Sequence, residues 1–306
     1  MIRYLSLRVL LTIPALWLIV TMVFMLVHIV PGDPVQQMLG EGARAQDLQQ
    51  LRHSLGLDLP IPVQYEHYVL GVLHGNFGES FRFQQPVARV VLEHFPATLE
   101  LAFVSLLVCL AISIPAGILA AHRRGTSADH AVGVFTLIGL SVPNFALGPV
   151  LILFFSVVLG WLPVSGRGGI GHLVLPAITL GAALAAILTR MVRTSVMEEL
   201  SSDYVRTARA KGLSETAVLF RHAFRNALIP ILTVIGLQFG TLLAGTIVTE
   251  TIFSWPGIGR LTVQAIEARD YPLLQGCILL IAFSYVAVNF LTDVVYVFVD
   301  PRVKMQ

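Results

Sequence analysis

The chain has 306 residues, of which 56% are apolar and only 12% are charged, and its mean hydropathy is +0.79. A typical soluble domain carries about twice that share of charged residues, so the composition excludes an ordinary soluble fold and predicts an all-α polytopic membrane protein. The formal net charge of +2 gives no indication of a nucleic-acid partner.

The apolar residues fall into runs long enough to cross a bilayer, because a helix of about 20 residues spans a hydrocarbon core of roughly 30 Å. We expect six transmembrane helices, at residues 9–30, 98–121, 132–159, 174–193, 227–250 and 275–298. The first run is too long for a cleaved signal peptide and lacks a small-residue cleavage site, so we expect it to remain as the first span.

Arg and Lys residues are distributed unevenly between the two sides of these spans. Six spans place both termini on one side, and the segments on that side carry 13 Arg and Lys residues, against seven on the other side. Cytoplasmic segments are enriched in these residues. The N- and C-termini are therefore predicted to be cytoplasmic, together with the loop at 194–226.

Residues 31–96, between the first two spans, form the longest segment outside the predicted membrane. Pro31-Gly32-Asp33-Pro34 predicts the turn that ends the first span. Short helices are then predicted before Gly56, after Pro62 and after Pro86. This pattern fits a docking surface and a simple lid over the helix ends equally well.

The third and fifth spans carry neutral polar and small residues. Pro143 frees a backbone carbonyl in the third span. In the fifth, Gly236, Gly240 and Ala244 recur every four residues and favour close helix packing. The candidate residues of a translocation path are Ser141, Asn144, Gln238, Thr241, Thr249 and Glu250. Ordinary helix packing is the alternative explanation for each of them.

Ionisable residues are nearly absent from the interiors of the spans, where Asp293 comes closest to an intramembrane acid. An ion-coupled secondary transporter, the alternative from a different functional class, usually keeps such groups near the middle of the membrane. The composition of the spans therefore argues against it. Cys109 and Cys277 lie inside predicted spans and are expected to be small packing residues rather than metal ligands.

Motifs that would make the chain an enzyme in its own right are missing. The sequence has no Gly-x-x-x-x-Gly-Lys-Ser/Thr loop for nucleotide phosphates, no His-Glu-x-x-His zinc pair and no Gly-x-Ser-x-Gly nucleophile turn. We therefore expect no metal and no cofactor on this chain. The same gaps argue against a second alternative, an intramembrane hydrolase.

Residues 203–230 are the most informative stretch, a basic helix–glycine–helix pattern between two apolar runs. Asp203 suits the start of a helix, Gly212 the left-handed position that ends it, and Ser214 the cap of a second helix. DNA-binding helix-turn-helix units have similar spacing, but membrane spans on both sides could not present this one to a duplex. The pattern therefore predicts a compact knob that a partner outside the bilayer grips.

This stretch resembles the cytoplasmic loop of binding-protein-dependent ABC transporter permeases, in the dipeptide, oligopeptide, nickel and glutathione subfamily. The resemblance extends along essentially the whole chain, through Pro31–Pro34, Gly75–Ser80, Pro86-Val87, Glu250–Arg260, Arg269–Pro272 and Asp300–Arg302. Registered on Gly212, the loop has Arg206-Thr207-Ala208 where the general family pattern has Glu-Ala-Ala, and it looks like the peptide subfamily's own variant.

The resemblance implies a type I ABC importer permease fold in a bacterial inner membrane, surrounded by lipid. It divides the chain into the N-terminus and first span (1–30), a periplasmic helical segment (31–96) and the permease core (97–306). The implied partners are a homologous second permease, two ATPase subunits that bind ATP and Mg²⁺, and a periplasmic or lipid-anchored substrate-binding protein. Di- and oligopeptides are the expected solutes, with glutathione or nickel complexes as alternatives.

The resemblance also implies that the ATPase subunits grip the 203–230 loop as a coupling helix. The residues expected to couple the permease to an ATPase are Asp203, Tyr204, Arg206, Ala208, Ala210, Lys211, Gly212, Leu213 and Ser214.

Overall fold

The computed structural model describes residues 2–29, 35, 44–54 and 56–299. This part of the chain is predominantly helical, and its only β-type pairing is an isolated bridge between Glu79 and Pro86. The helices are α1 (Ile2–Ile29), α3 (Ala45–Ser54), α4 (Ile61–Leu73), α5 (Val87–His122), α6 (Ser127–Ser141), α7 (Asn144–Leu151), the π-helix η1 (Ile152–Val158), α8 (Ile170–Leu200), α9 (Asp203–Ala210), α10 (Glu215–Ala217), the π-helix η2 (Val218–Phe224), α11 (Arg225–Gly245), α12 (Ile247–Ile252), α13 (Ile258–Glu267) and α14 (Tyr271–Val299).

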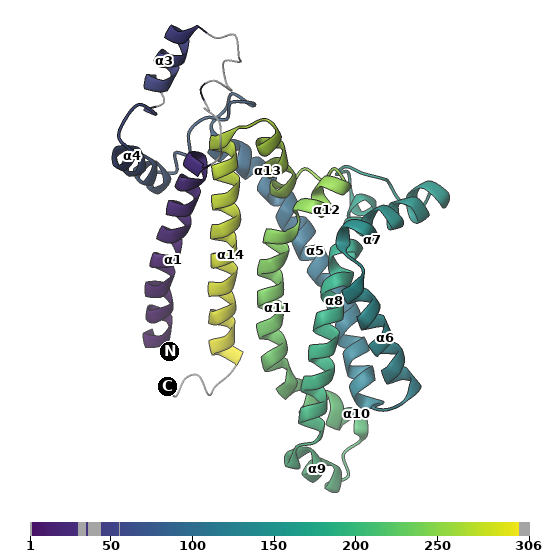
Figure 1. The fold of residues 1–306 in the computed structure, drawn as a ribbon. Coiled ribbons are helices and arrows are strands. Elements are labelled where there is room, and N and C mark those ends of the chain that lie inside the picture. The colour runs from purple at the N-terminus through teal and green to yellow at the C-terminus, as the bar shows by residue number, and fades with distance from the viewer. Residues whose placement is uncertain (1, 30–34, 36–43, 55, 300–306) are drawn as a thin grey trace.

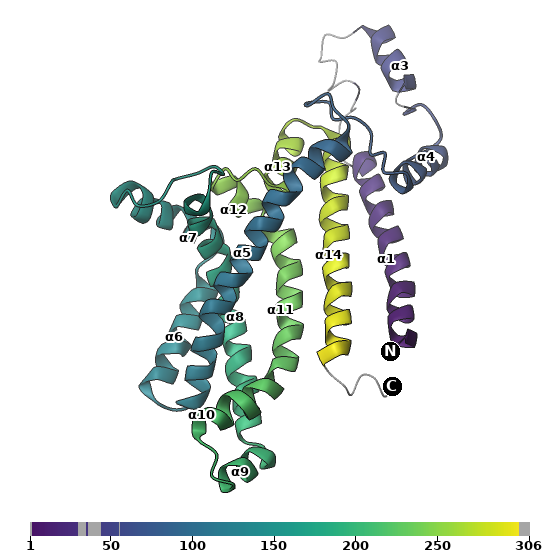
Figure 2. The same cartoon turned by 180° about the vertical axis from the view of Figure 1, so that it is seen from behind.

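The long helices lie side by side along one common direction, with short helices gathered at the two ends (Figures 1 and 2). Helices α3, α4, α12 and α13 lie at one end, and α9 and α10 protrude at the other. The first turn of α1 and the last turn of α14 lie toward the α9 end (Figure 1). The described ends of α1 and α14 therefore lie on the same side of the bundle as the 203–230 loop.

Within the described residues, five helices are long and apolar enough to cross a membrane, or six if one bent pair counts as a span. The bent pair is α6 and α7–η1, which meet at an angle of 101°. The span predicted at 132–159 is therefore bent sharply within its length. Pro143 explains the break, because it lacks a backbone N–H and disfavours helical geometry at Val142, which is extended.

Other boundaries also differ from the sequence prediction. Helix α5 runs without interruption from Val87 to His122, although a separate helix after Pro86 and a span from 98 were expected. Helix α11 ends at Gly245, so the last residues of the span predicted at 227–250 lie in the separate helix α12. Helix α8 continues to Leu200, beyond the predicted end at 193. The predicted turn at Pro31–Pro34 and the Asp300–Arg302 motif lie outside the described residues.

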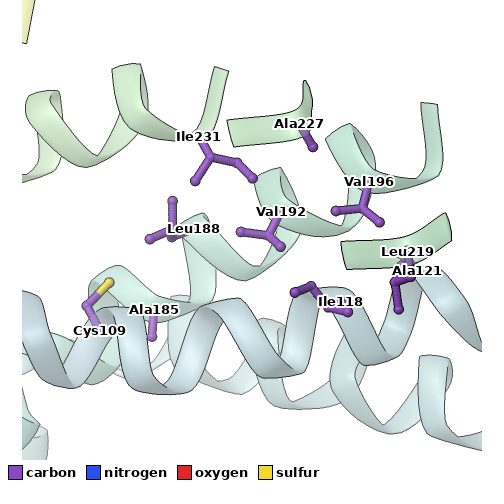
Figure 3. Close-up of a cluster of buried hydrophobic side chains, with 10 residues drawn as sticks. All are labelled: Cys109, Ile118, Ala121, Ala185, Leu188, Val192, Val196, Leu219, Ala227 and Ile231. Atoms are coloured by element: carbon purple, nitrogen blue, oxygen red, sulfur yellow. The ribbon is translucent and has the colours of Figure 1, made fainter. Parts of the chain in front are cut away.

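The centre of the molecule is the interface between α5 and α8, which also receives η2 and α11 (Figure 3). The buried residues of this cluster are Cys109, Ile118, Ala121, Ala185, Leu188, Val192, Val196, Leu219, Ala227 and Ile231. Small and branched aliphatic side chains let the four elements approach closely and fill the interior. Cys109 and Cys277 are free and fully buried, as expected for packing residues.

Helices α11 and α14 pack closely, as the spacing of small residues in the fifth predicted span indicates. A Cβ added at Gly236 would collide with the Thr292 side chain, and one added at Gly240 would lie 3.0 Å from the Tyr285 ring. Both contacts come from α14. The glycines therefore permit the two helices to approach each other. The side-chain surroundings of Ala244, the third residue of the pattern, lie outside the described residues.

Candidate functional site

The predicted helix–glycine–helix segment folds as a knob, residues 203–224, that hangs from the end of α8 (Figures 1 and 2). Gly212 has φ of +77°, the left-handed conformation expected where α9 ends. The Ser214 hydroxyl oxygen accepts a hydrogen bond from the Ala217 N–H at 3.4 Å and so caps the next helix. Both assignments made from the sequence are confirmed by this geometry.

The knob has a small apolar core of its own. Val205 and Ala208 from α9 pack against Val218 from η2, with Leu200 at the end of α8 alongside. The spacing of Val205 and Ala208 by three residues places both on one helix face. Ala208 therefore holds the knob together from inside and does not lie on its surface.

Two polar contacts fix the shape of the knob. Arg209 donates from Nε and Nη2 to the two carboxylate oxygens of Glu215, at 2.9 and 3.2 Å, so an ion pair spans the Gly212 turn. The Tyr204 hydroxyl donates to the Glu199 carboxylate and ties α9 to the end of α8. Burial and the Glu199 carboxylate raise the pKa of Tyr204 to about 12, so its hydroxyl remains a hydrogen-bond donor at neutral pH.

Asp203 does not cap α9 as the sequence suggested. Ser202 occupies the cap position, and no side chain there accepts a helix N–H. The Asp203 carboxylate lies 3.4 Å from Arg206 Nη1 instead, one turn along the exposed face. The carboxylate still lies at the positive end of the helix dipole, although without a capping hydrogen bond.

Eight of the nine predicted coupling residues are exposed on the knob, and they include acidic, basic and apolar groups. They are Asp203, Tyr204, Arg206, Ala210, Lys211, Gly212, Leu213 and Ser214. The sequence did not indicate the roles of Glu199, Arg209 and Glu215, because their partners lie five or six residues away across a turn, a spacing with no helical signature.

The six path candidates are not brought together into one surface. Ser141 and Thr241 are exposed and Asn144 is half-buried, whereas Gln238, Thr249 and Glu250 are buried. Ser141 and Asn144 flank the break between α6 and α7, where a backbone without regular helical bonding lies inside an apolar stretch. Irregular backbone at that depth is tolerated only against protein or a water-filled cavity.

Glu250 is enclosed by its own chain. The Thr98 hydroxyl donates to Glu250 Oε1 at 2.7 Å, and the Arg260 N–H donates to Oε2 at 2.9 Å. A side chain at Gly257 would collide with the carboxylate. Glu250 therefore organises the turn between α12 and α13, and in this conformation it does not face a path.

The turn that Glu250 organises holds a buried aromatic pair. Phe253 and Trp255 are almost completely buried, and Trp255 Nε1 donates to the Ala97 carbonyl of α5 at 2.8 Å. The Gly166 N–H donates to the Phe253 carbonyl at 2.8 Å and attaches the loop before α8. Helix α5 and the loop before α8, both distant in sequence, therefore converge on the turn between α12 and α13.

Hydrogen bonds to buried carboxylates link segments that are far apart in sequence. Arg193 on α8 donates to both oxygens of Asp129 on α6 at 2.7 and 2.9 Å, and Asp129 also accepts the Gly125 N–H at 3.0 Å. At the opposite end, Asp270 accepts from the Ser80 hydroxyl at 2.5 Å. These pairs hold the two ends of the helix bundle. Among the described residues, no group of three or more His, Cys, Asp or Glu is arranged to hold a metal ion.

Comparison with known proteins gives consistent matches along the chain. Residues 113–305 match the family described as "Binding-protein-dependent transport system inner membrane component", and residues 1–102 match the N-terminal family of such membrane components. The glutathione transport system permease protein GsiC of Escherichia coli K12 is 44% identical over 304 residues, which cover 99% of both chains. GsiC of Salmonella typhi is 43% identical with the same coverage.

Solved structures resemble the chain in fold. The inward-facing MetNI methionine ABC transporter superposes with a TM-score of 0.58 and 19% identity, over 69% of this chain and 96% of that one. An amino acid ABC transporter solved with histidines gives 0.52 and 14%, over 70% and 94%. At these identities the likeness concerns the helical architecture alone.

Proposed function

The chain belongs to the family of binding-protein-dependent transport system inner membrane components, and on that premise we propose how it performs its part of the transport cycle. It is a multi-pass inner-membrane permease subunit of an ABC importer. Its relatives are permease subunits rather than enzymes. Such a system includes ATPase and substrate-binding partners, so the energy and the solute both come from other chains.

The knob at residues 203–224 receives the movement of an ATPase subunit. This proposal rests on one observation: the knob, with its own core and an ion pair across its turn, protrudes beyond the bundle. A rigid element that continues from α8 transmits a displacement into the α5–α8 core, whereas a flexible loop would absorb it. Its exposed surface provides the docking contacts, and the buried Ala208 stabilises the conformation of that surface.

Two ATPase subunits drive the complex, one through this knob and one through the knob of a homologous second permease. Helix α7 and η1 support the presence of the second permease. They leave the bundle at the 101° bend, η1 buries none of its residues, and no charged residue occurs between His130 and Arg167. The exposed side chains of η1, Leu153, Phe154, Val157 and Val158, are all large and apolar, which suits packing against a neighbouring apolar surface.

Small peptides are the proposed solutes, with glutathione as the first candidate. Relatives that match the full length at 43–44% identity carry the name of a glutathione permease. α-Linked di- and oligopeptides, which the sequence resemblance favoured, and nickel complexes remain as alternatives. A periplasmic or lipid-anchored binding protein delivers the solute to the side that carries α3 and α4. In this arrangement residues 31–96 face the periplasm and both termini face the cytoplasm.

Uptake by the complete importer tests the function. A strain lacking this chain is complemented with the intact gene, and uptake of radiolabelled glutathione is measured with and without a hundredfold excess of an α-linked dipeptide or a nickel chelate. Uptake that depends on the chain and resists both competitors supports glutathione. Full competition by the dipeptide would assign the importer to α-linked peptides. Uptake abolished by an uncoupler at constant ATP would instead indicate an ion-coupled transporter.

A further inference from the structure

The ion pair between Glu100 and Arg167 lies beside the Phe253–Trp255 turn. Neither the proposed coupling to an ATPase nor the packing of the helix core accounts for it. Arg167 comes from the loop between η1 and α8, and Glu100 comes from α5. Arg167 donates from Nε and Nη2 at 2.9 and 2.5 Å, and both bonds end on the same oxygen, Glu100 Oε2. The two side chains are 41% and 37% exposed, so water and small solutes reach them.

This geometry leaves hydrogen-bonding capacity on both partners. Within the described residues, neither Glu100 Oε1 nor Arg167 Nη1 has a hydrogen-bonding partner. A bidentate Arg–carboxylate pair would use both oxygens, as Arg193 and Asp129 do. The Glu100–Arg167 pair can therefore accept one more donor and donate to one more acceptor without breaking.

The pair is also held in position. The Arg167 guanidinium lies over the Trp255 ring, 5.8 Å from its centroid, and the ring is fully buried with its N–H bonded to Ala97. The neighbouring Gly166 is fixed to Phe253 by a backbone bond of 2.8 Å. A cation placed over an aromatic face loses little further freedom when it binds an anion. A half-exposed ion pair contributes only about 0–1 kcal/mol, so its charges can be shared with a ligand at small cost.

We propose that Glu100 and Arg167 bind the α-amino-acid head of a γ-glutamyl peptide. In such a head an ammonium and a carboxylate sit on one carbon. The ammonium donates to Glu100 Oε1 while Arg167 Nη1 donates to the carboxylate. In an α-linked peptide these two groups lie at opposite ends of the molecule, so it cannot satisfy two neighbouring charges in this way. This inference rests on the proposed import of glutathione, and it assigns a selectivity contact within the permease itself.

Three solutes test the Glu100 contact and the Arg167 contact separately. Their transport is measured with the complete importer, reconstituted in liposomes with its binding protein. Glutathione carries both head groups, 4-aminobutyryl-Cys-Gly keeps the ammonium alone, and glutaryl-Cys-Gly keeps the carboxylate alone. Glu100→Gln is expected to weaken use of glutathione and of the amino analogue about tenfold, with little effect on the glutaryl analogue. Arg167→Gln is expected to weaken use of the glutaryl analogue about tenfold, with little effect on the amino analogue. A tenfold change is what loss of one charged hydrogen bond gives.

The pattern of transport losses across the three solutes distinguishes two roles of the pair. One is recognition of the solute, and the other is attachment of the η1–α8 loop to α5. An analogue that the wild-type importer does not carry is scored by its inhibition of glutathione uptake. An equal loss for all solutes, no loss in either variant, or weaker docking of the empty binding protein would each overturn the proposal. Glu267→Gln, which removes an exposed carboxylate at the same end of the molecule, is the matched control. If the wild-type importer carries no glutathione at all, the proposed function fails independently of this pair.

Discussion

Arg209 and Glu215 face each other across the Gly212 turn and join the two arms of the knob by two hydrogen bonds. Each residue alone is an ordinary surface charge, but together they link α9 to α10 across the turn. In the proposed transport cycle the arrangement of these two helices determines how the knob enters an ATPase groove.

Gly212 is expected to tolerate Asn but not Val. A Cβ at this position would meet nothing within 4 Å, so the constraint is the backbone φ of +77° alone. A left-handed conformation costs an ordinary residue about 1–2 kcal/mol, and less for Asn. Gly212→Val should abolish ATPase stimulation by the loaded binding protein while membrane insertion stays normal, and Gly212→Asn should keep most of it. Equal activity of the two variants would remove the assigned role of the turn.

The Arg209–Glu215 pair is expected to behave as an interchangeable pair. Both side chains are about half-exposed, so the pair contributes at most about 1 kcal/mol to stability. Arg209→Glu alone should reduce coupled ATPase activity several-fold, since two carboxylates would then repel across the turn. The exchange Arg209→Glu with Glu215→Arg should restore activity. If the exchanged pair did not restore activity, a partner would have to contact the charge at each of the two positions separately.

Glu250 is expected to be a stability residue. Replacing it with Ala leaves the Thr98 hydroxyl and the Arg260 N–H without their acceptor in a buried place, which costs about 1–3 kcal/mol for each group. Glu250→Ala should lower the unfolding temperature in detergent strongly, and Glu250→Gln only moderately because an amide oxygen still accepts.

The adjacent Thr249 supplies the control for Glu250. Its hydroxyl is buried and has no partner among the described residues, so Thr249→Val should be neutral or stabilising. A large loss of uptake in Thr249→Val at unchanged unfolding temperature would return this position to the translocation path.

The contact between α11 and α14 is expected to reject side chains at Gly236. A Cβ there would collide with Thr292, so Gly236→Val should force the helices apart and cost about 1–3 kcal/mol. Gly133 on α6 faces open space, and Gly133→Val serves as the matched change. Unfolding in detergent, followed by tryptophan fluorescence, measures the difference. Equal stability of the two variants would contradict the close approach.

Thiol labelling tests the proposed orientation. Both native thiols are fully buried, so a membrane-impermeant maleimide should give little background. Gln49→Cys on α3 should be labelled in cells with a permeable outer membrane, and Thr207→Cys on α9 only after the inner membrane is opened. Both positions are exposed and lie at opposite ends of the molecule. The reverse pattern would invert the topology.

Local pattern was sufficient to predict the helical class, most of the long apolar helices and the Gly212 turn. Length and hydropathy are properties of contiguous residues, and the left-handed glycine with the Ser214 cap is determined within three positions. The same approach failed at Asp203, because capping depends on side-chain conformation as well as residue type. It also missed the break at Val142, where the effect of Pro143 was anticipated but the 101° bend was not.

The sequence by itself therefore determined what kind of protein this is, since the free energy of placing apolar helices in a bilayer follows directly from composition. Only the tertiary structure decided which polar groups meet. Thr98 and Glu250 are 152 residues apart, Glu100 and Arg167 are 67 apart, and Asp129 and Arg193 are 64 apart. No local periodicity links such residues, and their hydrogen bonds exist only because the packing of α5, α6, α8 and α12 brings them together.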